Sequence, residues 1–413
     1  MPRVLFLMPT HTYRAGAFLA AAEKLQVEVT VASERAQALA DFAPGRTLVV
    51  DFTRPREAVQ TLVAFARERE VAAVVPVDDD TAVIAAQTAA ALGLPGNPPE
   101  AVRATREKHR LRQRLQQAGQ RVPWFRVCTT ADEPETVAAE VSYPCVLKPV
   151  FLSASRGVIR ADDPESFVRA FQRISALLQQ PEVAARGGEA ARLILVERYV
   201  PGREVALEGL LTDGHLRVLA IFDKPDPLEG PYFEETLYVT PTRLPTEAQQ
   251  ALTDGVAEAV QALGLRHGPV HAELRLNDEG AWLIEIAARS IGGLCSRTLR
   301  FGEDVSLEEL ILRHALGQET ASLPREQLAS GVMMLPIPQA GVLQEVQGVE
   351  AARAVPNVED VRITIPVGQQ LVPLPEGDRY LGFIFARAER PEAVEQALRD
   401  AFRRLRFVIE PRS

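Results

Sequence analysis

The sequence predicts a multidomain protein in which an α/β unit with a Rossmann-like parallel sheet precedes α+β units. Its 413 residues are more than one compact core usually holds. Strand-type and helix-type segments alternate over residues 1–97, which is typical of a doubly wound sheet. From about residue 120 the pattern changes to short strands joined by turns, which favours antiparallel pairing. Together these observations give the fold class.

The first domain, residues 1–97, is expected to contain three strands and three helices. The strands are predicted in RVLFLMPT, VEVTVAS and VAAVVPVDD, and the helices in AGAFLAAAEKL, PREAVQTLVAFARERE and DTAVIAAQTAAALG. The break LPGNPPE, rich in Pro and Gly, ends this domain. One further helix is expected from about Pro99 to Gly119.

The rest of the chain divides into residues 98–319 and residues 320–413. The former is expected to hold a small subdomain over about 120–200 and a large one over 201–319. Its strands are predicted in YPCVLKPV, RLILVERYV, EVALEGLLTD and HLRVLAIF, and its helices at 164–180 and 246–263. The last unit is predicted to be α+β, with strands in GVMMLPIP, VEDVRITIPV and YLGFIFARA and a helix at 391–405.

Charge and cysteine content exclude several classes of protein. The net charge is −9 and both signs are interspersed, which argues against nucleic acid held by bulk electrostatics. The first apolar run, about six residues, is too short for a signal peptide or a membrane span, so no membrane association is expected. Three scattered cysteines without metal-type spacing favour a reduced, cytoplasmic setting.

Lysine is rare in this chain. There are 42 arginines and four lysines, namely Lys24, Lys108, Lys148 and Lys224. A lysine kept against this bias marks a place where a compact ammonium suits the role better than a guanidinium fork.

Two acids interrupt the apolar strands of residues 271–293, HAELRLNDEGAWLIEIAARSIGG. Alternation places Glu273 on one face with His271 and Arg275, and Glu285 on one face with Leu283, Ala287 and Arg289. A three-residue turn, Asp278-Glu279-Gly280, pairs Leu276 with Trp282 and Leu274 with Ile284, which makes the other face apolar. The same register sets Glu273 opposite Glu285, with Cβ atoms roughly 5 Å apart.

Two carboxylates so close repel each other unless a proton or a cation lies between them. Carboxylate oxygens, together with phosphate oxygens, are the ligands that Mg²⁺ prefers. The alternative is a solvated hairpin whose acids are paired by Arg275 and Arg289.

Two further stretches are candidates for nucleotide binding. Lys148 ends an apolar strand and precedes a loop of small residues, 153–157, so its ammonium and the loop N–H groups are placed to contact phosphates. Residues 197–200 follow another strand and present extended backbone to an adenine edge, while Glu204 lies after a Pro-Gly turn and is placed to hold ribose hydroxyls. Taken singly, a surface lysine explains the first stretch equally well, and an ordinary β-hairpin connection with surface acids explains the second one better.

The order of these features along the chain resembles the ATP-grasp superfamily of carboxylate–amine ligases, over roughly residues 100–315. The resemblance implies an ATP-grasp domain at 98–319, whose small subdomain is a lid, after an N-terminal pre-ATP-grasp domain. It implies that Lys108, Lys148 and the lid loop bind nucleotide phosphates and that residues from Glu197 to Val200 hold adenine. It also implies that Glu204 binds ribose, that Glu273 with Glu285 binds Mg²⁺, with Mn²⁺ as an alternative, and that Arg289 and Lys148 are catalytic. The ATP-binding residues it implies are Lys108, Lys148, Ser153, Ser155, Arg156, Gly157, Glu197, Arg198, Tyr199, Val200 and Glu204.

Within the superfamily, FDKPDPLEGPYFEETLYVTP (222–241) and ARSIGG (288–293) resemble the L-amino-acid ligase branch, which makes dipeptides. This resemblance implies an amino-acid pocket that includes Glu235, Tyr238, Arg289, Gly292 and Gly293. The sequence departs from the family at position 287, where Ala replaces the usual Asn of the metal strand, and in the lid loop SASRG, which has one glycine. Arg156 is expected to supply charge there.

The sequence therefore predicts an ATP-dependent, cytoplasmic ligase that joins amino acids through an acyl-phosphate and, by resemblance, forms a homodimer. The alternatives are another ATP-grasp chemistry, such as a purine-pathway ligase or a bicarbonate-activating carboxylase, and a non-catalytic ATP sensor. Two features stay outside this prediction. Asp78-Asp79-Asp80 is expected to cap the following helix, and His11 lies near the end of the first strand.

Overall fold

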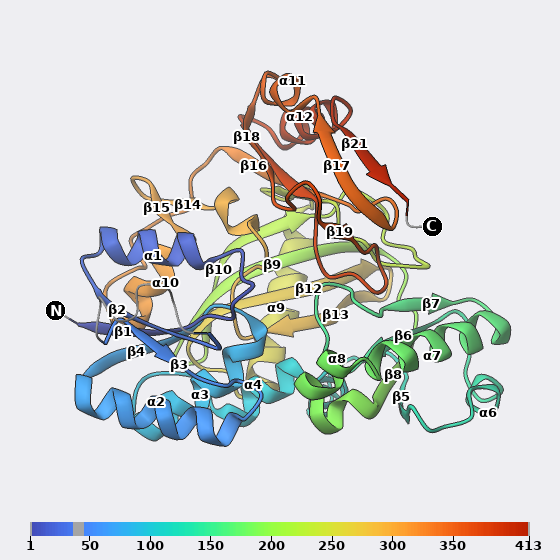
Figure 1. The fold of residues 1–413 in the computed structure, drawn as a ribbon, viewed down its shortest axis with the longest axis horizontal. Coiled ribbons are helices and arrows are strands. Elements are labelled where there is room, and N and C mark those ends of the chain that lie inside the picture. Colours follow the sequence, from blue (N-terminus) through green and yellow to red (C-terminus); the bar gives the residue numbers. More distant parts are fainter. Residues whose placement is uncertain (1, 36–44, 412–413) are drawn as a thin grey trace.

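The computed structural model describes residues 2–35 and 45–411 of the chain. Figure 1 shows three peripheral units around a central sheet, with the N-terminal unit (blue) and residues 125–198 (green) below and the C-terminal unit (orange to red) above. Each unit has its own sheet or its own part of the central sheet.

The N-terminal unit is a parallel four-stranded sheet with helices on both faces. Its strands have the order β3-β2-β1-β4 and span β3 (Thr47–Val49), β2 (Glu28–Ser33), β1 (Arg3–Leu7) and β4 (Val71–Pro76). Its helices are α1 (Ala15–Lys24), α2 (Pro55–Arg69) and α3 (Asp79–Leu92). Leu5 and Leu7 pack in the core under α2 and α3, whereas Val4 and Phe6 pack on the opposite side with α1. Because both faces are covered, β1 is apolar throughout, as a doubly wound sheet requires.

The single helix expected from Pro99 to Gly119 is wrong in one respect, because the structure has two helices there. They are α4 (Pro99–Arg106) and α5 (Lys108–Gln117), and Glu107 between them is extended. At this break the backbone N–H of Lys108 donates to the carbonyl of Val150, 2.9 Å away. A tertiary hydrogen bond thus replaces a helical one, and it fixes Lys108 beside the end of a strand in the next unit.

Residues 125–198 form an antiparallel sheet of order β5-β8-β6-β7, covered by helices on one side. The strands are β5 (Phe125–Thr129), β8 (Leu193–Arg198), β6 (Cys145–Pro149) and β7 (Ile159–Ala161). The helical segments are α6 (Pro134–Ala138), α7 (Pro164–Leu178), α8 (Pro181–Gly187) and η2 (Gly188–Arg192). A capping box at Asp163 and Ser166 begins α7, which buries Phe167, Phe171 and Ile174 against the sheet. We call residues 125–198 the lid unit.

The central sheet has eight strands, in the order β13-β12-β9-β10-β11-β16-β20-β18, and every neighbouring pair is antiparallel. Its strands are β9 (Arg203–Thr212), β10 (His215–Asp223), β11 (Leu237–Thr240), β12 (Gly268–Asn277), β13 (Gly280–Ala287), β16 (Ala329–Leu335), β18 (Val358–Ile363) and β20 (Gly382–Ala388). Helices α9 (Thr246–Leu263) and α12 (Pro391–Phe402) pack on it. The sheet is continuous across position 320, so the division of the chain there stays a prediction.

Shorter elements complete the structure. Between the central strands lie η3 (Cys295–Thr298), β14 (Arg300–Phe301), β15 (Val305–Ser306) and α10 (Leu307–Ala315). The C-terminal unit adds a small sheet of order β19-β17-β21 and one short helix, comprising β17 (Gly341–Gln347), α11 (Val349–Arg353), β19 (Gln370–Leu371) and β21 (Arg406–Glu410).

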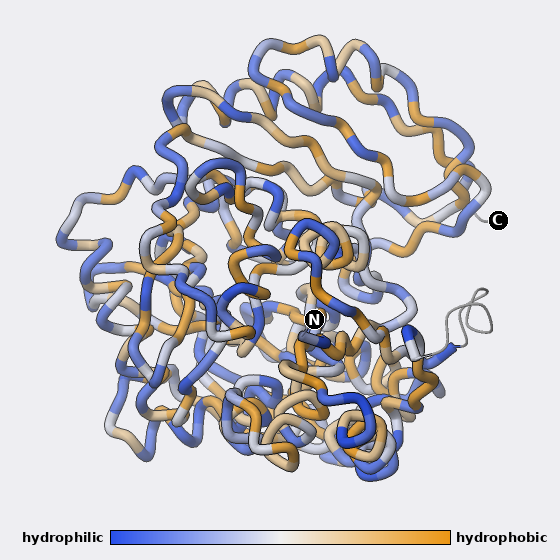
Figure 2. The backbone as a smooth tube through the Cα atoms, turned by 90° about the vertical axis from the view of Figure 1, so that its left-hand side faces the viewer, coloured by the Kyte–Doolittle hydropathy of each residue, from blue (hydrophilic) through white to orange (hydrophobic). Residues whose placement is uncertain are grey.

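Hydrophobic segments are short throughout the chain. Figure 2 shows hydrophobic and hydrophilic stretches alternating along the backbone in every unit. Among the helices of residues 2–35 and 45–411, none is both long and apolar enough to cross a membrane.

Candidate active site

One cavity of about 330 Å³ lies where the N-terminal unit, the lid unit and the central sheet meet. Nearly all the site residues predicted from the sequence line it. They are Lys108, Lys148, Ser153, Ser155, Arg156, Glu197, Arg198, Tyr199, Val200, Glu204, Glu235, Tyr238, Glu273, Glu285, Arg289, Gly292 and Gly293. His11, Asp78, Asp79 and Asp80 also line it, from the carboxyl end of the N-terminal sheet. The fold therefore gathers in one place residues that lie up to 282 positions apart, from His11 to Gly293.

Gly157 is the exception among the predicted residues, because it lies outside this lining. Its N–H donates to the carbonyl of Pro375, 2.8 Å away, and its φ of +74° is one that glycine adopts without strain. A Cβ at this position would lie 2.7 Å from Pro149 Cγ. The structure thus shows Gly157 as a turn residue that lets the lid loop pack against the C-terminal unit.

Arg156 also points toward the C-terminal unit. Its Nε donates to the carbonyl of Glu376 at 2.7 Å, and its Nη1 lies 3.6 Å from the Asp378 carboxylate. Arg173, on α7, pairs with the Glu376 carboxylate. These contacts hold the lid unit against residues 375–378. Arg156 also lines the cavity, and its contact with nucleotide phosphates stays a prediction.

The lysines of the nucleotide side are buried among charged partners. Lys148 pairs with the carboxylate of Glu197, whose other oxygen accepts from Arg112 Nε at 2.9 Å. Burial alone would raise the pKa of Glu197, but Arg112 and Lys148 outweigh it and lower the pKa to about 2. Lys108 Nζ donates to the carbonyl of Leu152 at 2.6 Å and lies 3.6 Å from Glu285. Both ammonium groups are therefore fixed at the cavity wall.

Two backbone N–H groups of residues 197–200, the stretch predicted to hold adenine, are engaged within the protein. The N–H of Arg198 donates to Trp124 and that of Tyr199 donates to Pro144. The carbonyl of Val200 accepts from Arg275 Nη1 at 2.8 Å. These two N–H groups are thus used within the protein, and the contact of residues 197–200 with adenine stays a prediction.

The carboxylate of Glu204, expected to hold ribose, has a cation on each oxygen. Oε1 lies 2.8 Å from Lys224 Nζ, and Oε2 accepts from Arg275 Nε at 2.8 Å. Arg275 therefore pairs with Glu204, and Arg289 pairs elsewhere. The alternative in which these two arginines neutralise Glu273 and Glu285 does not describe the structure.

Strands β12 and β13 place Glu273 opposite Glu285, as predicted, but by a different register. The turn has two residues, so Asn277 pairs with Gly280 and Leu274 with Leu283. A β-bulge then shifts the register between Leu274 and Glu273. The predicted pairs Leu276–Trp282 and Leu274–Ile284 are wrong, whereas the pair of acids is confirmed.

The bulge also changes which side chains face the cavity. Leu283 and Ile286 lie in the core under α9, while Ile284 and Glu285 both line the cavity. The extra residue of a bulge lets two successive side chains reach the same side, which simple alternation does not allow.

The acid pair fits a divalent cation by the chemistry of its groups. Both carboxylates line the same cavity and keep part of their surface exposed, 21% for Glu273 and 30% for Glu285. Burial acts to raise the pKa of Glu273, but Lys224 and His271 hold it well below its usual range, so the group is ionised. Position 287 is Ala, so Glu273 and Glu285 are the two carboxylate ligands that these strands offer.

On the substrate side, Tyr238 O–H donates to Glu235 Oε1 at 2.8 Å. Burial and the neighbouring Glu273 raise the pKa of Glu235 to about 7. Arg289 Nη2 bonds to Asp79 Oδ2 at 2.7 Å, so the N-terminal unit holds this arginine. Burial would raise the pKa of Asp79, yet Arg289 and Arg106 lower it to about 2. The expected capping role of the three aspartates is wrong for Asp78, which is the N-cap residue of α3 and makes no side-chain cap bond.

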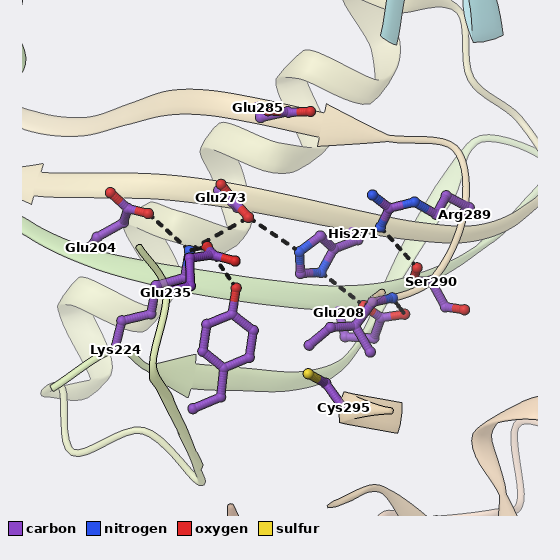
Figure 3. A network of polar contacts seen from close by, with 12 residues as sticks. Glu204, Glu208, Lys224, Glu235, His271, Glu273, Glu285, Arg289, Ser290 and Cys295 are labelled. Carbon is purple, nitrogen blue, oxygen red and sulfur yellow. Dashed lines mark hydrogen bonds and ion pairs between the residues drawn. The ribbon is translucent and has the colours of Figure 1, made fainter. Parts of the chain in front are cut away.

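Several residues of the site were missed by sequence reasoning. Figure 3 shows Lys224 between Glu204, Glu235 and Glu273, and His271 between Glu273 and Glu208. Glu208 is fully buried and also accepts from the N–H of Ile291 at 3.0 Å, which ties β9 to the segment that carries Arg289. Signals existed for two of them: Lys224 is one of four lysines, and Glu208 is an acid in an apolar strand.

Comparison with known families covers most of this architecture. Residues 141–298 match the ATP-grasp domain, residues 19–96 the ATP-grasp N-terminal domain, and residues 333–410 the L-amino acid ligase C-terminal domain 2. The chain is similar to the L-amino acid ligase from Bacillus licheniformis, with a TM-score of 0.81 and 25% identity over 99% of both chains. These matches confirm the predicted fold class.

Two curated relatives are also ligases or synthases by name. Chicken (Gallus gallus) carnosine synthase 1 is 31% identical over 66% of this chain and 31% of its own length. Alanine–anticapsin ligase of Bacillus subtilis is 27% identical over 73% of this chain and 67% of its own length. The chain thus spans about two thirds or less of the length of the curated relatives it matches.

Proposed function

We propose that this chain, which belongs to the ATP-grasp superfamily, is an ATP-dependent ligase that joins amino acids through a C–N bond. The observation that carries the proposal is the convergence, on one cavity, of two lysines, a pair of acids and an arginine beside a Glu–Tyr pair. The first groups suit a nucleotide and its cation, and the last suit an amino acid. The match of residues 333–410 to an L-amino acid ligase domain supports this substrate class over a purine precursor or bicarbonate.

The first step in this proposal transfers a phosphoryl group. An oxygen of the substrate carboxylate forms a bond to the γ-phosphorus of ATP, and the bond from that phosphorus to the β–γ bridging oxygen breaks, which yields an acyl-phosphate and ADP. Lys148 and Arg289 both line the cavity and stabilise this charge in the proposal. Mg²⁺ held by Glu273 and Glu285 would supply Lewis-acid charge to the phosphate oxygens.

The second step forms the product. The amine nitrogen attacks the acyl carbon, the C–N bond forms, and the C–O bond to phosphate breaks with release of phosphate and a proton. Glu235 and Tyr238 are placed to bind the amino group of a substrate by charge and hydrogen bond. Asp79 holds Arg289 across the cavity, which fixes the arginine before substrates bind.

An acyl-phosphate is lost to water unless the site is closed. The contacts of Gly157 and Arg156 with residues 375–378 keep the lid unit over the cavity. In this proposal the lid unit opens for nucleotide exchange and returns to these contacts during the reaction.

The test is phosphate release from Mg·ATP with pairwise mixtures of the twenty amino acids, followed by mass spectrometry of the products. We expect release that requires amino acids and a product mass equal to two amino acids less one water. Omission of ATP, of the metal or of either amino acid is the control. Release with bicarbonate and none with amino acids would favour a carboxylase, and ATP binding without release in any mixture would favour a sensor. The homodimer and the cytoplasmic location stay predictions.

A further inference from the structure

Lys224 follows β10 and is buried at the point where three carboxylates converge. Its Nζ lies 2.8 Å from Glu204 Oε1 and 3.5 Å from Glu273 Oε1, and it also bonds to Glu235 Oε1. The side chain is 3% exposed, and its ammonium lies 5.0 Å from the centre of the Tyr238 ring. An ammonium has three N–H donors, and here two are hydrogen-bonded to Glu204 and Glu235, while Glu273 forms an ion pair at the longer distance.

These acids come from different parts of the chain. Glu204 begins β9, Glu273 lies in the middle of β12, and Glu235 precedes β11. Under the proposed function they serve three different ligands, namely the nucleotide, the metal ion and an amino acid. Lys224 therefore contacts one acid from each of the three proposed parts of the site.

Without a cation among them, the three acids would not keep this arrangement. One oxygen from each of Glu204, Glu235 and Glu273 lies within 4.8 Å of the others. Three carboxylate oxygens at that spacing repel one another or bind a single divalent cation between them. The ammonium of Lys224 occupies that place, so it removes the repulsion and also excludes a metal ion.

The contacts of Glu273 show how Lys224 orients the two oxygens of this carboxylate. One oxygen, Oε1, faces both Lys224 and His271, at 3.5 and 3.6 Å. Figure 3 shows the second oxygen on the side of Glu285, on the neighbouring strand. The same carboxylate thus has one oxygen held by fixed cations and one directed to the acid with which it would share a metal ion.

We propose that Lys224 is a positioning residue with two effects: it directs Glu273 toward Glu285, and it keeps divalent cations out of the cluster of Glu204, Glu235 and Glu273. The proposal rests on the proposed function only in naming the ligands of these acids. Its geometric part, that an ammonium takes the place of a metal ion, stands without any turnover.

The test measures Mn²⁺ binding to the full chain in the absence of nucleotide, with electron paramagnetic resonance as the readout. Lys224→Met removes the charge and keeps the length of the side chain. We expect this variant to gain one Mn²⁺ per chain, bound at least about tenfold more tightly than any ion the wild type binds at the three acids. In the double variant Lys224→Met/Glu235→Gln, the second change removes one carboxylate ligand, so the additional Mn²⁺ should no longer bind. Lys224→Arg keeps the positive charge and should not bind the additional Mn²⁺ either.

Lys24→Met is the matched control, since this lysine is 51% exposed on α1, where it contacts Glu309. It should bind Mn²⁺ as the wild type does. Folded Lys224→Met with wild-type Mn²⁺ binding would overturn the proposal. If that variant does not fold, Lys224→Gln, which keeps hydrogen-bond donors without charge, takes its place, and the same gain is required of it.

Turnover gives a second, separate readout. With a substrate pair identified, Lys224→Met should raise the KM for the amino acid about tenfold and lower kcat, while Lys224→Arg restores part of both. A purely structural lysine would change stability and leave the Mn²⁺ stoichiometry unaltered. Failure to find any ligase activity would remove the proposed function but not a gained Mn²⁺ site, so the two proposals fail separately.

Discussion

The two faces of strands β9 and β12 differ in how they are stabilised. On one face, Leu207, Ala272 and Leu274 pack in an apolar core under α9. On the other, Glu204, Glu273 and their neighbours form a network of ion pairs at the cavity. The strands are the same, and only the parity of the residue number separates the two faces.

The comparison shows that one backbone carries two kinds of constraint. The apolar face tolerates any set of side chains that fills the space, because dispersion and burial have no direction. The charged face depends on named partners, because a buried charge that loses its partner leaves an uncompensated group. Changes on the first face should therefore affect stability, and changes on the second should affect activity.

The largest effect is expected from Glu273→Gln on the charged face. The variant loses a carboxylate directed at Glu285, so phosphate release in the amino-acid assay should fall about 10²- to 10³-fold. Glu279→Gln, in the turn of the same hairpin and 61% exposed, is the control and should keep wild-type rates. Equal activity of the two variants would remove Glu273 from the metal site.

On the apolar face, Leu252→Ala should lower the free energy of unfolding by about 3 kcal/mol, because the fully buried Leu252 fills the core between α9 and the sheet. Urea unfolding followed by circular dichroism measures this. The KM values of the folded variant should stay within about twofold of the wild type. Leu19→Ala, at a half-exposed leucine of α1, should change stability by less than about 1 kcal/mol. A large change in KM for Leu252→Ala would show that the two faces are coupled.

His314 sharpens the comparison, since it is buried and forms no ion pair with a carboxylate of residues 2–35 and 45–411. It lies on α10, with Nε2 2.9 Å from Thr212 Oγ1 and its ring stacked on His267, and Asp213 is the nearby acid. Burial and His267 lower the pKa of His314 to about 4, against an unfolded value of about 6.5. Between pH 4 and pH 6.5, His314 is therefore protonated in the unfolded state and neutral in the folded state.

The stabilisation from neutral His314 is thus complete above pH 6.5 and lost as pH falls through about 4. From pH 7 to pH 4 the free energy of unfolding should fall by about 2–3 kcal/mol more in the wild type than in His314→Gln. Urea unfolding at pH 7, 5.5 and 4 measures the difference. Parallel pH profiles for the two proteins would show that His314 does not stay neutral in the folded state.

The smallest effect is expected from Asp79→Asn, where the charged face meets the N-terminal unit. Loss of the 2.7 Å bond to Arg289 should raise the KM for the amino acid about tenfold, because Arg289 then samples more positions. Initial rates at varied amino-acid concentration measure this. Asp51→Asn, at an exposed acid of the same unit, is the control. A fall in kcat with unchanged KM would mean that Arg289 acts after binding instead.

Much of the fold followed from the sequence because its signals are local. The N-terminal parallel sheet, the helix α9 and the opposition of Glu273 and Glu285 depend on periodicity within a few residues. The order of lysines and acids along the chain then indicated the family.

Where prediction was wrong, a distant partner had decided. The extended residue Glu107 divides the predicted helix in two, so that the Lys108 N–H donates to the carbonyl of Val150. A two-residue turn with a β-bulge near Ile284 replaces the expected three-residue turn. At Glu107 the distant partner is Val150, and at the bulge it is Arg112, which donates to the carbonyls of Leu283 and Ile284. Such contacts outweigh a local preference of about 1 kcal/mol.

By itself, then, the sequence determined which face of a regular strand is apolar and where acids interrupt it, since side-chain direction alternates along a strand that has no bulge. Only the tertiary structure decided which cation each acid meets. Lys224 joins three acids from three segments, and Asp79 holds Arg289 from 210 residues away. The strength of a buried ion pair depends on distance and on exclusion of water, and both are set when the units pack together.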